Sequence, residues 1–305
     1  MRRSSSHLVK PQTVDDLRRV PFTRALQRRS NLSHQYSGAT NPPKQCKKPR
    51  ISSQSWIVAY SNGQVIESYN ANEIREIASL SKIMTCIVVI EEILRTRRSF
   101  HELIHVSEPS TNIIGTKANL TPNDCLKIWD LLHALMLPSG NDAALTLAEH
   151  IGKTLDPTNP LSSFVQKMNS LAKSLKMDST SFSNPHGLSN TTNLSSAKNL
   201  SVLVNYALSN TVFRKIVAKK EYACSILGVG GYRKVTWENT NRLLNKGFCG
   251  VKTGFTPNAG PCLACSLERG GRRVVLILLS AKTMNSRWTE AGKLIKWLIS
   301  EGKIL

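Results

Sequence analysis

SLSKIMTCIVVIEEIL, residues 79–94, is the stretch that decides the fold. It is apolar on nearly every side at helical spacing, and Arg95, Arg97 and Arg98 follow it, where cations suit the C-terminal end of a helix dipole. A helix that is apolar all round must be covered by other elements. The stretch therefore predicts a buried central helix, and 305 residues with 40% hydrophobic content are enough to build a core around it.

Two short β-prone runs precede this helix. Residues 56–60 read WIVAY, residues 65–69 read VIESY, and Asn62-Gly63 lies between them. Asn-Gly favours a two-residue hairpin with a type I′ turn, which needs positive φ at both central residues. An antiparallel sheet is therefore predicted to begin near Ser55.

Later segments supply further elements of both kinds. Apolar runs predict strands over 261–267 and 272–281, joined at Gly270-Gly271. Helical spacing predicts helices over 121–137, 142–153, 161–175, 195–209 and 288–299. Strands at both ends with helices between them indicate an α+β domain, whose antiparallel sheet is built from distant parts of the chain and covered by helices. We expect this domain to span residues 51–305.

The first 50 residues have a different composition. They hold twelve Lys or Arg against two acidic residues, and five prolines interrupt them without a sustained period of 2 or 3.6. We expect residues 1–50 to form a disordered basic tail, with an organellar transit segment as the alternative. No apolar run follows Arg2 and Arg3, so a secretory signal is not recognisable, and the compartment stays open. No stretch approaches the roughly 18 apolar residues of a membrane span, and neither a lipid anchor nor a membrane-binding helix after Leu305 is expected.

The net charge of +21, with a pI near 10.0, raises nucleic acid as a partner. The tail carries ten of these charges, and the basic residues show neither a reader motif nor interleaved aromatics. We therefore expect no nucleic-acid partner.

Seven cysteines are scattered along the chain without a disulfide framework. Cys262 and Cys265 form the one short pair, but they fall in a predicted strand, where residues three apart point to opposite faces. No second Cys or His pair with zinc spacing accompanies them. We expect no metal site there, and most cysteines to be reduced and buried.

Four Ser-x-x-Lys pairs occur: Ser79/Lys82, Ser170/Lys173, Ser195/Lys198 and Ser300/Lys303. Only Ser79 and Lys82 stand where a loop enters the buried helix, and side chains three apart share one helix face. Backbone N–H groups at a helix start favour the negative charge that develops on an attacked carbonyl. Burial lowers the pKa of a lysine, which makes its amine a base for the serine hydroxyl. The other three pairs read as ordinary solvated residues.

Two more short motifs carry chemistry. Ser139-Gly140-Asn141 lies between two apolar helical stretches, where a plain helix break with an N-cap is the alternative explanation. Lys252-Thr253-Gly254 comes shortly after Gly250. The glycine after the threonine lets a ligand lie along a strand edge, and the lysine supplies a fixed charge for a carboxylate. A solvated lysine before a strand-breaking glycine is the alternative.

Together the three motifs occur in the order found in penicillin-binding proteins and serine β-lactamases. From about Ser55 to Trp297 the chain resembles the D-alanyl-D-alanine carboxypeptidase family, the low-molecular-weight penicillin-binding proteins. Residues 184–188 (NPHGL) match a signature of that family, and 239–244 and 253–260 are similar to its later landmarks. The resemblance implies a transpeptidase-like or β-lactamase-like fold with the active site between the sheet and a mainly helical region.

The same resemblance implies the roles of the site residues and the partners. Ser79 would be the acyl-ester nucleophile, with its own N–H in the oxyanion hole, Lys82 the proton acceptor and Ser139 a proton relay. The substrate side would be held by Asn141 at the amide, and by Lys252 and Thr253 at the terminal carboxylate. The substrate would be a peptide ending in D-Ala-D-Ala, β-lactams would be covalent inhibitors, and no cofactor or metal would be needed.

Several alternatives stay open beside this reading. A class A β-lactamase needs a Glu that activates the deacylating water, and no Glu lies between Glu149 and Glu221. A non-catalytic penicillin-binding or peptide-binding domain is the second alternative, although such a domain is not expected to keep all three motifs intact. Catalysis by His186 is a third, but in the family that segment is structural. Ser81 stands where the family usually has Thr, a mild departure.

Overall fold

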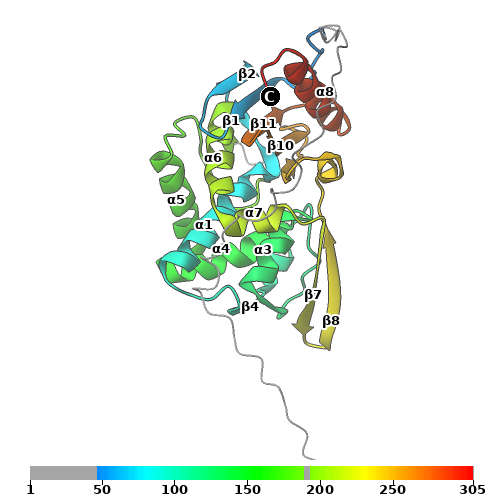
Figure 1. The fold of residues 1–305 in the computed structure, drawn as a ribbon. Coiled ribbons are helices and arrows are strands. Elements are labelled where there is room, and N and C mark those ends of the chain that lie inside the picture. Colours follow the sequence, from blue (N-terminus) through cyan, green and yellow to red (C-terminus); the bar gives the residue numbers. More distant parts are fainter. Residues whose placement is uncertain (1–46, 189–192, 305) are drawn as a thin grey trace, which may run out of the picture. The chain divides into compact units, whose positions relative to one another are not determined.

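The computed structural model describes residues 47–188 and 193–304. The predicted tail over 1–50 therefore lies almost wholly outside the described residues and stays a prediction. Five strands form the main antiparallel sheet, in the order β2-β1-β11-β10-β9 (Figure 1). Their bounds are β1 Ser55–Tyr60, β2 Val65–Tyr69, β9 Val251–Gly254, β10 Cys262–Arg269 and β11 Arg272–Leu279.

Segments from opposite ends of the described chain meet in this sheet. Ser55 pairs with Leu279 and Tyr60 with Val274, so β1 and β11 lie side by side although more than 200 residues separate them. The expectation of a sheet built from distant parts of the chain is confirmed. Strand β9, which carries Lys252-Thr253-Gly254, is an edge strand and pairs only with β10 within the described sheet.

The hairpin that opens the sheet differs from the predicted one in its turn. Of the two central residues only Gly63 has a positive φ, of 87°. The Gly63 N–H donates to the carbonyl of Tyr60, the Tyr60 N–H donates to Gln64, and the register shifts between Val58 and Ala59. A turn followed by a left-handed glycine and a bulge therefore replaces the two-residue type I′ turn, which was a wrong prediction.

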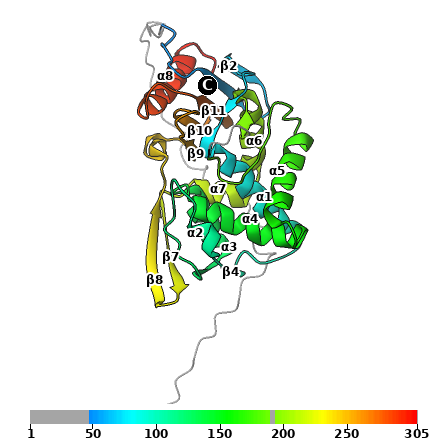
Figure 2. The same ribbon diagram turned by 180° about the vertical axis from the view of Figure 1, so that it is seen from behind.

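Helices cover both faces of the main sheet. Helix α8 (Ser286–Ser300) packs on one face, and α1 (Ser81–Arg95) and α6 (Ala197–Ser209) lie on the other. Alternate residues of β1 enter the two cores, Ile57 on the α1 side and Trp56 on the α8 side. Burial on both faces explains why β1, β10 and β11 read as continuous apolar runs rather than alternating ones. Figure 2 shows the same layers from behind.

The helical region surrounds α1, whose residues Ser81 to Ile90 are all buried. The remaining helices are α2 Glu108–Thr111, α3 Ile128–Met136, α4 Asn141–Leu155, α5 Pro160–Ser174 and α7 Thr211–Val217. Of these, α3, α4, α5 and α7 contact α1. The predicted central helix is confirmed, and 142–153, 161–175, 195–209 and 288–299 are helical almost throughout.

One predicted helix begins later than expected. Thr121 donates its N–H and its hydroxyl to the Asp124 carboxylate, at 2.7 and 2.9 Å, which closes a turn instead of a helix. The next three residues form β5 (Cys125–Lys127), paired with β4 (Leu103–His105) and, through Cys125, with β7. The prediction of a helix over 121–137 is therefore wrong for its first seven residues.

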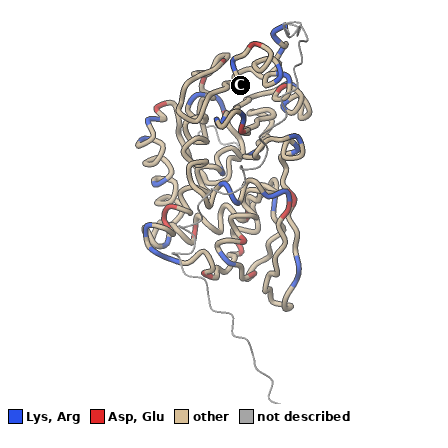
Figure 3. The backbone as a smooth tube through the Cα atoms, in the orientation of Figure 1, with Lys and Arg blue, Asp and Glu red and all other residues tan. Residues whose placement is uncertain are grey.

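Two smaller sheets complete the described part. Strands β4 and β5 continue into the hairpin of β7 (Glu221–Gly228) and β8 (Gly231–Glu238), and β3 (Arg75–Glu76) pairs with β6 (Leu194–Ser195). Short 3-10 turns lie at η2 (Ala78–Leu80) and η3 (Arg242–Lys246). Lys and Arg are scattered over helices, loops and the β7–β8 hairpin (Figure 3). Among the residues that are described, no helix is both long and apolar enough to cross a membrane.

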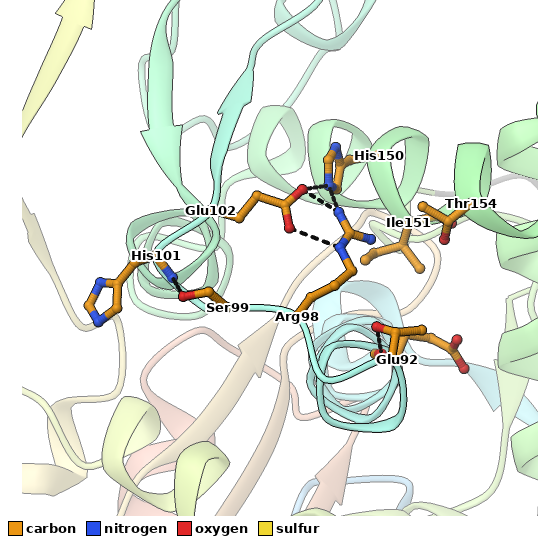
Figure 4. A network of polar contacts seen from close by, with 9 residues as sticks. Glu92, Arg98, Ser99, His101, Glu102, His150, Ile151 and Thr154 are labelled. Atoms are coloured by element: carbon orange, nitrogen blue, oxygen red, sulfur yellow. Dashed lines mark hydrogen bonds and ion pairs between the residues drawn. The ribbon is translucent and has the colours of Figure 1, made fainter. Parts of the chain in front are cut away.

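A polar cluster joins the end of α1 to α4 (Figure 4). Arg98 binds both carboxylate oxygens of Glu102, and His150 of α4 contacts both side chains. Burial, followed by the charge of Arg98, lowers the pKa of His150, so the imidazole is neutral at pH 7. The bidentate ion pair of Arg98 and Glu102 holds the chain in place just after the C-terminal end of α1.

Candidate active site

Ser79 lies at the centre of the η2 turn, directly before α1. Ala78 precedes it with a φ of 48°, a left-handed conformation that costs a non-glycine residue energy. Gly187 packs against this turn: a Cβ there would lie 2.0 Å from the Ala78 carbonyl oxygen, and its φ is 84°. Only glycine fits at 187, and the packed turn leaves Ser79 partly exposed while both of its neighbours are buried.

Lys82 is completely buried, and its amine has three polar neighbours. The Nζ atom lies 3.0 Å from the Ser79 Oγ and 2.7 Å from both the Asn141 Oδ1 and the His186 carbonyl oxygen. Burial, and then the positive charge of Lys252, hold the pKa of Lys82 well below its usual range, although Asp142 opposes them. The amine is therefore predisposed to be neutral.

A neutral amine has two hydrogens and one lone pair. The Asn141 and His186 oxygens can only accept, so they orient the two hydrogens. The Asn141 amide is fixed in this sense because its Nδ2 donates to the Ile114 carbonyl at 2.7 Å. The lone pair of Lys82 is left facing the Ser79 hydroxyl, which is the geometry of a base ready to take the serine proton.

The Ser139-Gly140-Asn141 turn brings the second motif to Lys82. Ser139 is buried and has a φ of 68°, another left-handed non-glycine residue. Asn141 begins α4, and the buried Asp142 carboxylate accepts the N–H groups of Ala118 and Leu120 at 2.9 to 3.1 Å, which holds the preceding loop on the helix. Among the described residues the Ser139 hydroxyl makes no hydrogen bond to Ser79 or Lys82.

The third motif lies on edge strand β9, beside Ser79. Residues directly opposite in antiparallel strands share a face, so Lys252 and Gly254 face the α1 side with their partners Ala264 and Cys262. A Cβ at Gly254 would lie 3.1 Å from the Ser79 N, which shows how closely the strand passes the η2 turn. The absence of a side chain keeps this approach open.

The lysine and threonine side chains of this motif have different hydrogen-bond partners. Lys252 is 1% exposed and donates to the Thr253 carbonyl at 3.0 Å. Burial, and then the nearby Arg287, lower its pKa to about 7. The Thr253 hydroxyl lies 2.8 Å from that of Thr240, whose N–H donates to the Leu137 carbonyl just before the Ser139 turn. Lys252 thus acts electrostatically on Lys82, and the Thr253 hydroxyl lies beside the loop that contacts the second motif.

Arg287 at the start of α8 is a site neighbour that the sequence gives no sign of. Its Nη1 donates to the carbonyls of Gly254 at 2.9 Å and Cys262 at 3.1 Å, and its guanidinium lies over the Trp288 ring. Its Nε has no partner among the described residues, and burial lowers its pKa to about 10. A buried cation behind the motif strand is found only when α8 is folded against β9.

Asn184, His186 and Asn193 support the turn that carries Ser79. Asn193 donates through its Nδ2 to the Asn184 Oδ1 at 2.9 Å and to the Ser81 hydroxyl at 3.3 Å, and Ser81 donates to the Ala78 carbonyl at 3.0 Å. The Ser81 side chain thus supplies the hydroxyl that both of these contacts use. His186 contributes its carbonyl to Lys82; burial first, and then Lys82, lower the pKa of its imidazole to about 3.

The structure thus brings Ser79, Lys82 and Asn141 into one hydrogen-bonded group, with Lys252 buried nearby. Within the described ranges no cluster of three or more His, Cys, Asp or Glu side chains is arranged to hold a metal ion. Cys262 and Cys265 lie in the two different cores, as residues three apart on a strand must. The arrangement can attack an acyl carbonyl with a serine, using a lysine as base.

Comparison with known proteins gives matches to D-alanyl-D-alanine carboxypeptidases. The family model described as D-alanyl-D-alanine carboxypeptidase matches residues 42–283. The D-alanyl-D-alanine carboxypeptidase of Streptomyces sp. (strain K15) is 31% identical over 272 residues, 85% of this chain and 91% of that protein. DacF of Bacillus subtilis (strain 168) is 29% identical over 247 residues, 80% of this chain but 61% of that protein, so the chain spans about three fifths of its length.

Solved structures agree in fold. The crystal structure of the Streptomyces K15 DD-transpeptidase superimposes with a TM-score of 0.78 at 30% identity, covering 83% of this chain and 98% of that one. Penicillin binding protein 6B from Escherichia coli gives a TM-score of 0.73 at 29% identity, covering 84% and 80%. The α+β, transpeptidase-like fold expected from the sequence is confirmed by these neighbours together with the observed sheet.

Proposed function

The chain belongs to the D-alanyl-D-alanine carboxypeptidase family of serine peptidases, and on this premise we propose that it removes the last residue from peptides ending in D-Ala-D-Ala through an acyl-enzyme. The observation that carries the proposal is the buried Lys82 amine, 3.0 Å from the Ser79 hydroxyl, with both of its other contacts being acceptors. This is an activated nucleophile in a family whose chemistry requires one.

Acylation begins at Ser79. Lys82 accepts the hydroxyl proton as the Oγ–C bond forms, and the Ser79 backbone N–H donates to the developing oxyanion. The proton passes by way of the Ser139 hydroxyl to the nitrogen of the terminal D-alanine, the C–N bond breaks, and D-alanine leaves. Water then attacks the ester, which releases the shortened peptide and restores the Ser79 hydroxyl.

The substrate lies along the free edge of β9 in this proposal. An edge strand offers unpaired N–H and C=O groups to an extended peptide, and Asn141 is close enough to Lys82 to reach the amide next to the scissile bond. Lys252 and Thr253 hold the terminal carboxylate, Lys252 as a buried positive charge and Thr253 through its hydroxyl. The same Lys252 charge helps to keep Lys82 neutral, so one residue serves binding and catalysis.

β-Lactams occupy the same place in this proposal and leave a penicilloyl ester on Ser79. The missing Glu between Glu149 and Glu221 removes the water-activating group of class A β-lactamases, so the ester is expected to be long-lived. A purely binding role does not explain why a lysine is kept buried beside a serine at the cost of its charge. We also propose that residues 51–305 form the peptidase domain and acylate without the tail.

Release of D-alanine tests the function. Acetyl-blocked peptides ending in D-Ala-D-Ala should release D-alanine with the native protein and not with Ser79→Ala. The same peptide ending in L-alanine is the matched control and should be spared. Equal release from both peptides, or release that survives Ser79→Ala, would overturn the proposal.

A further inference from the structure

Aromatic rings join the β7–β8 hairpin to α3. Tyr222 of β7 stacks on His133 of α3, with ring centroids 3.8 Å apart and ring planes 17° apart. Trp237, the cross-strand partner of Tyr222 in β8, has its ring 6.4 Å from that of Tyr222 at an angle of 11°. The Tyr222 hydroxyl donates to the Asp130 carboxylate at 2.5 Å. His133 is fully buried and Trp237 is 5% exposed, so close packing holds the Trp237 ring in place.

The Trp237 indole contacts a loop that has no helix or strand of its own. This loop, residues 112–124, runs between α2 and β5. The Trp237 Nε1 donates to the Ala118 carbonyl at 2.9 Å, and the Ala118 N–H donates to the Asp142 carboxylate at 2.9 and 3.0 Å. Ala118 is 2% exposed, so both of its backbone polar groups depend on these partners. The hairpin and the start of α4 therefore hold the loop between them.

The same loop determines which way the Asn141 amide is turned. The Ile114 carbonyl accepts the Asn141 Nδ2 at 2.7 Å, which leaves the Oδ1 directed at Lys82. Gly115 lets the backbone come this close, because a Cβ there would lie 2.8 Å from the Asn141 Nδ2. An amide turned over would instead offer its Nδ2 to Lys82 and bind the lone pair that the Ser79 hydroxyl needs. The position of the loop therefore decides whether Lys82 is free to act as the base.

We propose that Trp237 is a positioning residue for the reaction. By holding Ala118, it keeps the Ile114 carbonyl in place, only four residues away on the same loop. That carbonyl in turn keeps the Asn141 Oδ1 turned toward Lys82. The proposal rests on the proposed function, because it takes Lys82 as the base of that reaction. It gives the β7–β8 hairpin a part in the reaction, although the three hydrogen-bond partners of the Lys82 amine all lie outside the hairpin.

The test removes the indole N–H but keeps a ring beside Tyr222. With Trp237→Phe, the second-order rate of acylation by a fluorescent penicillin should fall about 5- to 10-fold, the factor that matches the net contribution of one buried hydrogen bond. Trp237→Leu lacks the same N–H and takes its place if Trp237→Phe does not fold. Ile226→Val, which shortens a fully buried side chain of the same hairpin, is the matched control for lost packing. It keeps the indole, so its rate should stay within about 2-fold of the native rate although it costs similar stability.

A double substitution traces the route of the effect. In Asn141→Ala there is no amide left to turn, so adding Trp237→Phe should lower the acylation rate by less than about 2-fold. A loss of about 5- to 10-fold in that background would show that Trp237 acts by another route, and would overturn the proposal.

A second measurement does not depend on acylation. In protein made with isotope-labelled asparagine, the NMR signal of the Asn141 side-chain amide is identified by its absence from Asn141→Ala. Its exchange with water should be about 5- to 10-fold faster in Trp237→Phe than in the native protein, and unchanged in Ile226→Val. Equal exchange in the native protein and in Trp237→Phe, or an equal change in both variants, would refute the positioning role.

The two proposals fail in different ways. If penicillin does not label Ser79 in the native protein, the proposed function is wrong, and exchange of the side-chain amide alone decides whether Trp237 holds Asn141 in place. If Ser79 is labelled but Trp237→Phe acylates at the native rate, or Ile226→Val is slowed as much, the positioning role is wrong and the proposed function stands.

Discussion

Replacing Asn141 by Asp should disable the base without removing any member of the nucleophile pair. The Asn141 Oδ1 lies 2.7 Å from the Lys82 Nζ, so the substitution puts a carboxylate beside the amine. At an effective dielectric constant of about 20, a charge pair at that distance is worth about 6 kcal/mol, which would raise the pKa of Lys82 by about 4. The buried carboxylate also resists ionisation, so we expect about half of that rise.

The assay is the second-order rate of acylation by a fluorescent penicillin, measured from about pH 6 to about pH 9. Because Lys82 must be neutral, a rise of about 2 in its pKa moves the acid limb of the rate–pH profile up by about 2 pH units, and on that limb it lowers the rate by about 100-fold. The ratio of native to variant rates should shrink as the pH rises, since both proteins then hold a neutral lysine. Using the ratio cancels any pH dependence that Lys252 adds to both.

Two controls isolate the charge. Asn141→Ala removes the same hydrogen bonds without adding a carboxylate, so the acid limb of its profile should stay in place or move to lower pH. Asn62→Asp adds the same charge in the exposed β1–β2 turn and should behave like the native protein. If the acid limb of Asn141→Asp coincides with the native one, Lys82 is not the base and the proposed mechanism is wrong.

Three further changes test other parts of the site. Lys252→Ala should slow the reaction of a free-acid peptide by about 30- to 150-fold, or about 2 to 3 kcal/mol, and that of a C-terminally amidated peptide much less. Equal slowing of both peptides would show that Lys252 does not bind the terminal carboxylate. Burial depresses the pKa of His186 to about 3 in the folded protein, against 6.5 in the unfolded chain, so the folded protein loses stability as the pH falls below 6.5 and the unfolded chain takes up a proton. The free energy of unfolding in urea should therefore be about 2 kcal/mol smaller at pH 5 than at pH 7.5, and His186→Gln should lack this loss. Gly187→Ala should cost about 3 kcal/mol or more in the same assay, against about 1 for Gly271→Ala, which has a φ of 70° but no atom within 4 Å; equal costs would refute the close packing on Ala78.

Much of the fold could be predicted because it depends on local apolar patterns. The all-round apolar run over 83–94 and the continuous strands over 262–279 identify the central helix and the sheet before any long-range contact is known. Errors arose where polar contacts override local preference. Asp124 captures Thr121 and delays a helix, and the bulge after Val58 changes the turn at Gly63. Strands β7 and β8 were missed because their outer faces are polar or exposed.

The residues of the site likewise divide into those that the sequence indicates and those that only the folded chain reveals. Ser79 and Lys82 are adjacent on one turn, so their proximity follows from spacing alone. The contact of Lys82 with Asn141 joins residues 59 positions apart, and only the family resemblance had placed Asn141 in the site, as a substrate-binding residue. Arg287 and Asp142 could not be found from sequence, because an isolated Arg near a helix start and an Asp after an Asn look like ordinary surface residues. Their importance comes from burial, which only the folded chain creates.

The central claim is that Ser79 is the residue that becomes acylated, and intact-mass analysis after penicillin treatment tests it most directly. The account predicts one covalent adduct of the mass of the antibiotic, mapped by peptide analysis to Ser79, absent from Ser79→Ala and present in Ser170→Ala, a serine of another Ser-x-x-Lys pair on the exposed face of α5. An adduct that persists in Ser79→Ala, or that maps to Ser170 or Ser195, would contradict it.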